Sequence, residues 1–175
     1  IYLDKLIEQH EIPFVTTWTA SDLFATDHPL NLGIIGMSGQ RGANRAVFHA
    51  DLFICLGTHL SIPHTTTLFD SYAPQAKKVI VNIDGDQLDN LNVQFDLKIK
   101  GDVATYIEWL SKKNIKKFNW PDISEFKGQN WYSPNITPLP NSNVYIRELT
   151  KQTTGKICLV VDGGGTALYA GFQSS

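Results

Sequence analysis

Residues 52–57, Leu-Phe-Ile-Cys-Leu-Gly, are the stretch that decides the fold class of this 175-residue chain. The run is continuously apolar and ends at a glycine. A strand without polar alternation is typical of a parallel sheet that helices cover on both faces. A second run at 77–84, KKVIVNID, is β-branched and is followed by Gly85 and Asp86. Together the two runs predict an α/β protein rather than an antiparallel sandwich.

Helical patterns alternate with these runs along the first part of the chain. The expected strands are 12–16, 52–56, 79–83 and 97–99, with a further short strand at 34–35. The expected helices are 2–10, 43–50 and 103–110, the last with Asp102 as its N-cap. Strands and helices joined by short connections predict a Rossmann-like parallel sheet with helices on both faces.

The composition changes after Lys113. Residues 114–143 hold two of the four tryptophans and show little periodicity, so we expect an inter-domain linker that lies along a surface. Beyond it we expect a helix through Gln152 that Ser142 or Asn143 caps, a strand at 156–162 and the beginning of another helix. The predicted domains are therefore 1–113, a linker at 114–143, and the start of a second, truncated α/β unit at 144–175. Helical patterns at both ends predict that the chain is a fragment.

Charge and composition exclude several classes of protein. The chain has 15 Lys and Arg against 17 Asp and Glu, and it has no basic run, which argues against nucleic-acid binding. No apolar stretch approaches the roughly 20 residues that span a bilayer, so no membrane partner is expected. Cys55 and Cys158 lie in apolar runs, which predicts neither a disulfide framework nor a metal site. We expect a cytoplasmic protein.

Glycine-rich and polar segments follow the predicted strands. The loop at 36–44 contains Gly39, Arg41 and Asn44 and leads into a helix, whose free N–H groups favour a phosphate. The alternative is a tight structural turn, because the spacing is not the dinucleotide fingerprint. Residues 57–61 follow a buried strand, where open α/β sheets bind ligands, although loops are polar in any case.

Two further segments carry an acid or glycines at strand ends. Asp84 either holds a ribose hydroxyl or caps a helix. Gly163, Gly164 and Gly165 form either a cradle for a diphosphate or a flexible turn. No nucleophile–base pair, acid dyad or metal triad is visible in the sequence, so no catalytic or metal-binding residue is predicted.

Taken together, three segments resemble the thiamine-diphosphate enzymes of the acetolactate synthase type. Residues 7–60, IEQHEIPF through FICLGTHL, look like the start of the central domain of these enzymes. Residues 77–110, KKVIVNIDGD through YIEWL, look like its end. Residues 156–173, KICLVVDGGGTALYAGFQ, look like the first strand and turn of their diphosphate-binding domain. The order and spacing of these segments carry the resemblance.

The resemblance implies a homo-oligomeric parent enzyme with pyrimidine-binding, central and diphosphate-binding domains. Such an enzyme uses thiamine diphosphate and Mg²⁺ to decarboxylate a 2-keto acid such as pyruvate and to transfer the acyl group to a second keto acid. This chain would be the central domain without its first strand, plus the opening of the third domain. The activating glutamate and the Mg²⁺-binding segment would lie outside it, so the fragment is expected to be inactive.

The resemblance also implies a crevice for FAD or ADP in the central domain. By matching positions, the crevice would be lined by Gly39, Arg41, Asn44, Gly57, Thr58, His59, Leu60 and Asp84. Gly163, Gly164 and Gly165 would approach the thiamine diphosphate. Acetolactate synthases usually carry an arginine where His59 stands here, so FAD is expected to bind no better than ADP. The rival hypotheses are a non-catalytic Rossmann-like nucleotide-binding or oligomer-scaffold module, and a 2-keto acid decarboxylase of the same family.

Overall fold

The computed structural model describes most of the first 127 residues and parts of the remainder. The described residues are 2–115, 120, 122–127, 141–153, 155, 157, 160, 163–165 and 169–171. The predicted strand at 156–162 and the helix after it lie largely outside these residues.

Five strands and six α-helices follow one another in the described part of the chain. The strands are β1 (Phe14–Thr16), β2 (Asn31–Ile34), β3 (Leu52–Leu56), β4 (Lys77–Asn82) and β5 (Leu97–Lys100). The α-helices are α1 (Tyr2–His10), α2 (Arg41–His49), α3 (Ile62–Thr65), α4 (Gly85–Asp89), α5 (Val103–Ser111) and α6 (Ser142–Lys151). Single 3-10 turns are η1 (Trp18–Ala20), η2 (Phe69–Ser71) and η3 (Ser124–Phe126). None of the described helices is long and apolar enough to cross a membrane.

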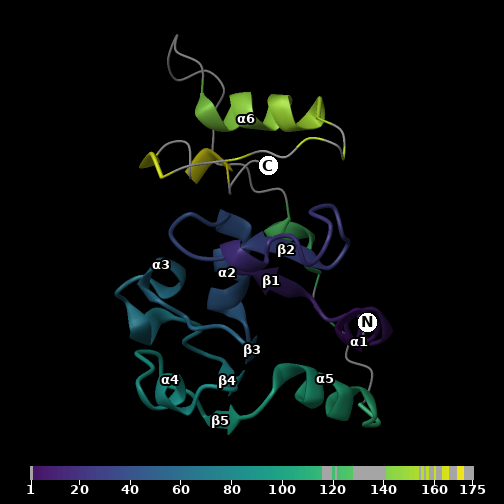
Figure 1. Cartoon of the computed structure of the whole chain (residues 1–175), viewed down its shortest axis with the longest axis vertical. Helices are drawn as coiled ribbons and strands as arrows, with labels where there is room; N and C mark the ends of the chain where they lie inside the picture. The colour runs from purple at the N-terminus through teal and green to yellow at the C-terminus, as the bar shows by residue number, and fades with distance from the viewer. Residues whose placement is uncertain are drawn as a thin grey trace.

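The strands form parallel pairs, as expected, but in two sheets rather than one. β1 pairs with β2, while β3, β4 and β5 form a second sheet in that order. Figure 1 shows the strands in the spatial order β2, β1, β3, β4, β5. Among the described residues no ladder of hydrogen bonds joins β1 to β3, so the expected parallel strands form two adjacent sheets. The parallel α/β class itself is confirmed.

One apolar core lies beneath both sheets. Ala43 and Val47 of α2 are buried in the same cluster as Cys55 of β3 and Ile80 of β4. Val15 of β1 packs against this cluster as well. The two sheets are therefore parts of one layer, and α2 covers the face of that layer that carries these side chains.

Helices α1 and α5 pack against each other outside that cluster. α5 also contacts β4, and Ile107 on its inner face is buried. Helical spacing predicts a buried face of Leu3, Leu6, Ile7 and His10, and α1 buries the last three while Leu3 is half-buried. The periodic faces of both sequences are thus the faces that pack.

Side-chain caps fix where α5 and α6 begin. Asp102 accepts hydrogen bonds from the backbone N–H of Thr105 at 2.8 Å, as the sequence predicts for an N-cap. The expected cap of the helix near 142 is wrong by one or two residues. Asn141 takes this role, because its Oδ1 accepts from the N–H groups of Asn143 and Val144.

Part of the predicted linker lies against the first unit of the chain. We call Trp120 and residues 122–127 the docked segment. Trp120 Nε1 donates to the carbonyl of His10 at 2.8 Å, and Lys127 Nζ donates to the carbonyl of His28 at 3.1 Å. Phe126 is buried, with Arg45 of α2 over its ring at 5.8 Å. These contacts hold the docked segment on α2, α1 and the loop before β2.

Candidate functional site

The segments that follow β3 and β4 meet at the carboxyl edge of the second sheet. Gly57 N–H donates to the carbonyl of Val81 at 2.9 Å, so the loop after β3 starts beside β4. The side-chain amide of Asn82 then donates to the carbonyl of Thr58 at 3.4 Å. Parallel strands end on one side of a sheet, which is why two distant glycine-containing turns become neighbours.

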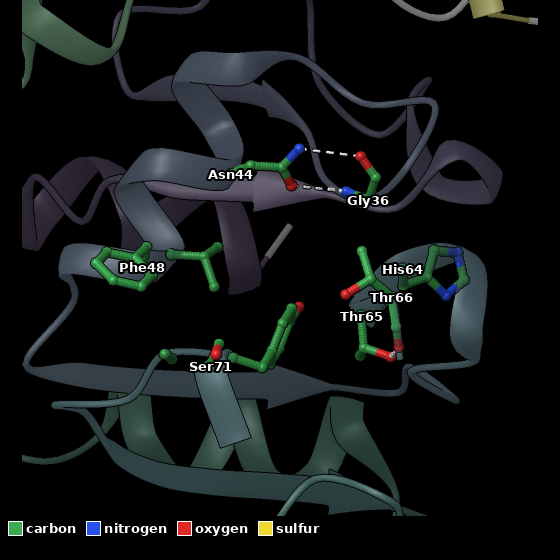
Figure 2. Close-up of a pocket in the computed structure, with 10 residues that line it drawn as sticks. Gly36, Asn44, Phe48, His64, Thr65, Thr66 and Ser71 are labelled. Atoms are coloured by element: carbon green, nitrogen blue, oxygen red, sulfur yellow. Dashed lines mark hydrogen bonds between the residues drawn. The ribbon is translucent and has the colours of Figure 1, made fainter. Parts of the chain in front are cut away.

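The loop after β2 joins this edge through α3. Asn44 of α2 bonds Gly36 twice, accepting from its N–H at 2.8 Å and donating to its carbonyl at 2.9 Å, as Figure 2 shows. Met37 N–H donates to the carbonyl of Pro63 at 2.8 Å. Asn44 is therefore a structural clamp on the loop, and its amide is already satisfied.

The glycines of the loop at 36–44 are explained by close contacts within the chain. A Cβ on Gly36 would lie 2.3 Å from the carbonyl oxygen of Pro63, and Gly36 has φ of +100°. A Cβ on Gly39 would lie 2.2 Å from the carbonyl oxygen of Ile34. For Gly42 the nearest atom is the carbonyl oxygen of Phe126, at 1.8 Å. The close approach that glycine permits is made here by backbone, as the structural alternative predicted.

The residues predicted after β3 and β4 have different surroundings. Asp84 is exposed, and its Oδ1 accepts from the N–H groups of Asp86 and Gln87 at 3.0 and 3.2 Å, so it caps α4. Thr58 is half-buried and its Oγ1 accepts from the N–H of Leu60 at 3.3 Å. His59 is exposed and Leu60 is buried with φ of +47°.

A cavity of about 230 Å³ lies between α2 and α3. Its lining residues are Gly36, Asn44, Val47, Phe48, His64, Thr65, Thr66, Ser71, Tyr72 and Ala73. Figure 2 shows Asn44 and Gly36 on one side of it, Ser71 on the opposite side, and Phe48 and His64 at its two ends. Sequence reasoning identified only Asn44 among these side chains. His64, Thr65 and Thr66 were not predicted as site residues, although the crowding of polar side chains beside Pro63 was a usable signal.

Two buried side chains of the cavity wall have polar atoms without a partner. His64 and Tyr72 are each 8% exposed, and His64 Nε2 and the Tyr72 hydroxyl make no hydrogen bond. His64 Nδ1 is already bonded to Ser61 Oγ at 3.2 Å. An unpaired buried polar group costs about 1–3 kcal/mol, so both atoms favour a bound water or ligand group.

Burial and charge keep this cavity neutral. Burial lowers the pKa of His64, and a charge on nearby His59 lowers it further. Burial raises the pKa of Tyr72. No lysine, arginine or carboxylate is among the lining residues. The cavity therefore suits an uncharged group with hydrogen-bonding edges. A volume of roughly 150 Å³ already accommodates a benzene-sized molecule, so a single ring fits.

Backbone strain also gathers at this cavity. Thr66 has φ of +62° and Ala73 has φ of +48°, although neither is a glycine. A β-branched residue rarely adopts a positive φ, and each such position costs of the order of 1–3 kcal/mol. Strain of this kind is common at binding sites, which supports the cavity as a candidate site.

The predicted diphosphate turn at 163–165 provides fewer contacts for a ligand than the cavity does. A Cβ on Gly163 or Gly164 would meet nothing within 4 Å, and on Gly165 it would reach only Tyr169 Cε2 at 3.9 Å. The described residues at this turn leave space but do not enclose a diphosphate. Among the described residues there is no cluster of three or more His, Cys, Asp or Glu side chains that could hold a metal ion.

Comparison with known proteins gives one consistent family. The sequence model described as "Thiamine pyrophosphate enzyme, central domain" matches residues 2–110. A probable acetolactate synthase large subunit of Methanocaldococcus jannaschii is 38% identical over 103 residues, which cover 59% of this chain and 17% of the relative. The acetolactate synthase of Mycobacterium bovis is 39% identical over 105 residues, covering 60% and 17%.

One relative extends over nearly the whole chain. The acetolactate synthase large subunit of Buchnera aphidicola subsp. Schlechtendalia chinensis is 28% identical over 190 aligned residues, which cover 98% of this chain and 32% of the relative. The chain thus spans about a third or less of the length of these curated relatives.

Proposed function

The chain belongs to the thiamine pyrophosphate enzyme family, through its central domain, and on this premise we propose that the whole protein is an acetolactate synthase-type enzyme. The observation that carries the proposal is the match over residues 2–110, shared with relatives named acetolactate synthase. Residues 1–113 would form the central domain without its first strand, 114–143 the linker, and 144–175 the start of the diphosphate-binding domain.

The proposed reaction is decarboxylation of a 2-keto acid and transfer of the acyl group to a second keto acid. When bound, thiamine diphosphate with Mg²⁺ supplies the nucleophilic carbon for this chemistry. The described residues of this chain form no site for that group, so no catalytic step is assigned to them. A homo-oligomeric state and a cytoplasmic location belong to the same proposal.

The relatives by themselves do not separate a synthase from a 2-keto acid decarboxylase or from a non-catalytic module. The full reading frame that contains this chain, expressed and assayed with pyruvate, thiamine diphosphate and Mg²⁺, tests the proposal. We expect acetolactate as the product. Acetaldehyde alone would favour the decarboxylase, and no turnover of pyruvate or other 2-keto acids would favour the non-catalytic module.

We further propose that this chain binds an adenine nucleotide weakly at the carboxyl edge of its strands. The cavity between α2 and α3 would hold an uncharged part of the ligand through His64 and Tyr72, whose buried polar atoms are unpaired. Thr58 and His59 lie at the same edge of the sheet. Asn44 and Asp84 would support the site indirectly, because they already bond the chain's own backbone.

Isothermal titration of the chain with ADP, FAD and thiamine diphosphate tests this site. We expect weak binding of ADP, no tighter binding of FAD, and no binding of thiamine diphosphate. Tyr72→Phe removes a hydroxyl that would bond the ligand in the cavity, so it should weaken ADP binding severalfold. Tyr106→Phe on α5 is the matched control and should leave it unchanged. Tight FAD binding would contradict the argument from His59, and equal ADP affinity in both variants would place the nucleotide elsewhere.

A further inference from the structure

Residues 61–72, which we call the connecting segment, run between β3 and β4 and form one side of the cavity. The segment contains α3 and η2, and it contributes to the lining His64, Thr65, Thr66, Ser71 and Tyr72. Figure 2 shows Thr65 and Thr66 of this segment on the side of the cavity opposite Phe48 of α2. The position of the connecting segment therefore decides whether the cavity is open or closed.

Three residues at the ends and in the middle of the connecting segment have a positive φ, although none of them is a glycine. Leu60 precedes the segment with φ of +47°, and Ala73 follows it with φ of +48°. Thr66, at the end of α3, has φ of +62° and ψ of −167°, a combination that glycine alone adopts readily. Residues at the ends of elements are those that absorb the change in φ and ψ when a loop moves. These three positions therefore have the strain and the placement of hinges.

The connecting segment also seals two polar atoms from water. His64 Nε2 and the Tyr72 hydroxyl are buried and have no hydrogen-bond partner. His64 Nδ1 bonds Ser61 Oγ, which belongs to the same segment, so the imidazole would move with it. Outward movement would give both unpaired atoms water as a partner. Backbone strain and unpaired polar atoms thus both favour an open arrangement.

Apolar packing opposes this tendency and holds the connecting segment closed. Tyr72 belongs to the buried core cluster, and its ring meets that of Phe53 edge-on at 5.6 Å. Hydrogen bonds of the described segment run largely within it. Two that leave it are donated by Met37 N–H to the carbonyl of Pro63 at 2.8 Å and by Lys78 Nζ to the carbonyl of Tyr72 at 3.2 Å. Opposing contributions of this kind are the condition for a second, less populated arrangement.

We propose that the connecting segment is a lid, which turns outward about Leu60 and Ala73 to admit a ligand and then closes over an uncharged group of that ligand. In the closed arrangement this group would bond His64 Nε2 and the Tyr72 hydroxyl, so the ligand offsets the cost of sealing them. Ligand binding thus favours the closed lid. The inference rests on the cavity of the proposed nucleotide site and deepens that proposal, but opening of the lid does not depend on the ligand being a nucleotide.

Cys55 on β3 provides a probe of the open lid. Its thiol is 3% exposed, and burial raises its pKa, so it should be unreactive while the lid is closed. Burial, and then the nearby Cys55, raises the pKa of Tyr72, which places the thiol beside the side chain that the opening lid would withdraw. The chain has two cysteines, so Cys158→Ser leaves Cys55 as the single thiol.

Labelling of this single-cysteine chain with a dipyridyl disulfide measures how often the lid opens. The Cys55 thiolate attacks one sulfur of the reagent, forms a mixed disulfide and releases thiopyridone, whose absorbance gives the rate. We expect labelling at least about tenfold slower than in the unfolded chain, with a rate that stays constant across low urea concentrations. A local opening exposes little surface, and the sensitivity to urea scales with the surface exposed.

Glycine at the strained position tests what controls the opening. Thr66→Gly removes the strain of the closed lid, so it should slow labelling about three- to tenfold. Thr67→Gly is the matched control, because Thr67 is equally an exposed threonine of this loop but has no positive φ. It should not slow labelling. ADP should slow labelling further, and Tyr72→Phe should reduce the effect of ADP because one bond to the ligand is lost.

Two results would overturn the lid. Labelling that accelerates from the lowest urea concentrations, in parallel with unfolding seen by circular dichroism, would mean that only global unfolding exposes Cys55. Equal labelling rates in Thr66→Gly and Thr67→Gly would mean that backbone strain does not control the opening. Labelling that is constant at low urea, slowed by Thr66→Gly and unaffected by ADP would support the lid and contradict the nucleotide proposal, so the two failures are distinguishable.

Discussion

His64 and Tyr72 are both buried in the cavity wall, although both side chains carry polar atoms that need hydrogen-bond partners. Each side chain is buried, which favours the apolar surroundings, yet each keeps a polar atom without a partner in the described structure. For His64 this conflict extends to charge, because burial lowers its pKa and so disfavours the imidazolium. The folded state thus holds a neutral ring at a position that the unfolded chain protonates near pH 6.5.

This difference predicts a pH-dependent stability. Below pH 6.5 the unfolded chain takes up a proton at His64 that the folded chain refuses, so the free energy of unfolding should fall as pH falls. One proton contributes at most about 1.4 kcal/mol per pH unit. Urea unfolding between pH 5 and pH 7 measures the slope. His64→Gln should flatten it, whereas His49→Gln, at an exposed site on α2, should not. Equal slopes in all three proteins would contradict the prediction.

The N-terminus of α5 shows how a single capping side chain fixes where a helix begins. Asp102 accepts from both the N–H and the hydroxyl of Thr105, at 2.8 and 3.1 Å. The Thr105 backbone N–H lowers the pKa of Asp102, so the ionised cap persists to acidic pH. The cap also sets the start of α5, which pairs with α1 and contacts β4.

Removing this cap should loosen α5. Asp102→Ala leaves the first N–H groups of the helix without a side-chain acceptor, and we expect the midpoint of thermal unfolding to fall by about 2–4 °C. Asp102→Asn keeps an acceptor oxygen and should lose less. Circular dichroism melts at pH 7 compare the variants. An Asn variant as unstable as the Ala variant would show that charge, rather than the cap bond, stabilises the helix.

The sequence predicts elements here better than it predicts their assembly. The strand at 52–56 is recognisable from its apolar run, and the helix at 103–110 from the helical spacing of its apolar residues. The structure confirms both. The sequence predicts a strand only at 34–35, whereas β2 spans Asn31–Ile34. The start of the strand was missed because Asn31 and Gly33 are residue types that are rare in strands. The break between the sheets has no local signal, since it depends on which strand lies beside which.

The sequence likewise predicted some parts of the candidate site and missed others. Position after a strand correctly brought Thr58 and the 82–84 turn together. It gave no means of telling a ligand-binding glycine from one pressed against backbone, as at Gly39, because that contact comes from elsewhere in the chain. His64 and Tyr72 were missed for a related reason, as only the folded chain leaves their polar atoms unpaired.

Across the whole molecule, the docked segment joins parts that are far apart in sequence. Phe126 meets α2 at Gly42, where there is no room for a side chain. Gly42→Ala should therefore destabilise the chain by about 1–3 kcal/mol, despite the better helix propensity of alanine. Gly101→Ala, which meets nothing within 4 Å, is the control and should be nearly neutral. Urea unfolding monitored by circular dichroism compares them, and two equal midpoints would show that the docked segment yields freely.

The docked segment also shows that the end of the family-model match and the end of the packed unit are different positions. The match to the central-domain model ends at residue 110, and a domain boundary taken from that match would fall there. Yet a piece cut at that point would lose the indole that bonds His10 and the ring that covers Arg45, and it would bare the first turn of α2. The docked segment therefore belongs to the same packed unit as residues 2–110, although it lies beyond the match to the central-domain model. A truncation that ends at residue 110 should unfold more readily than one that ends at Lys127.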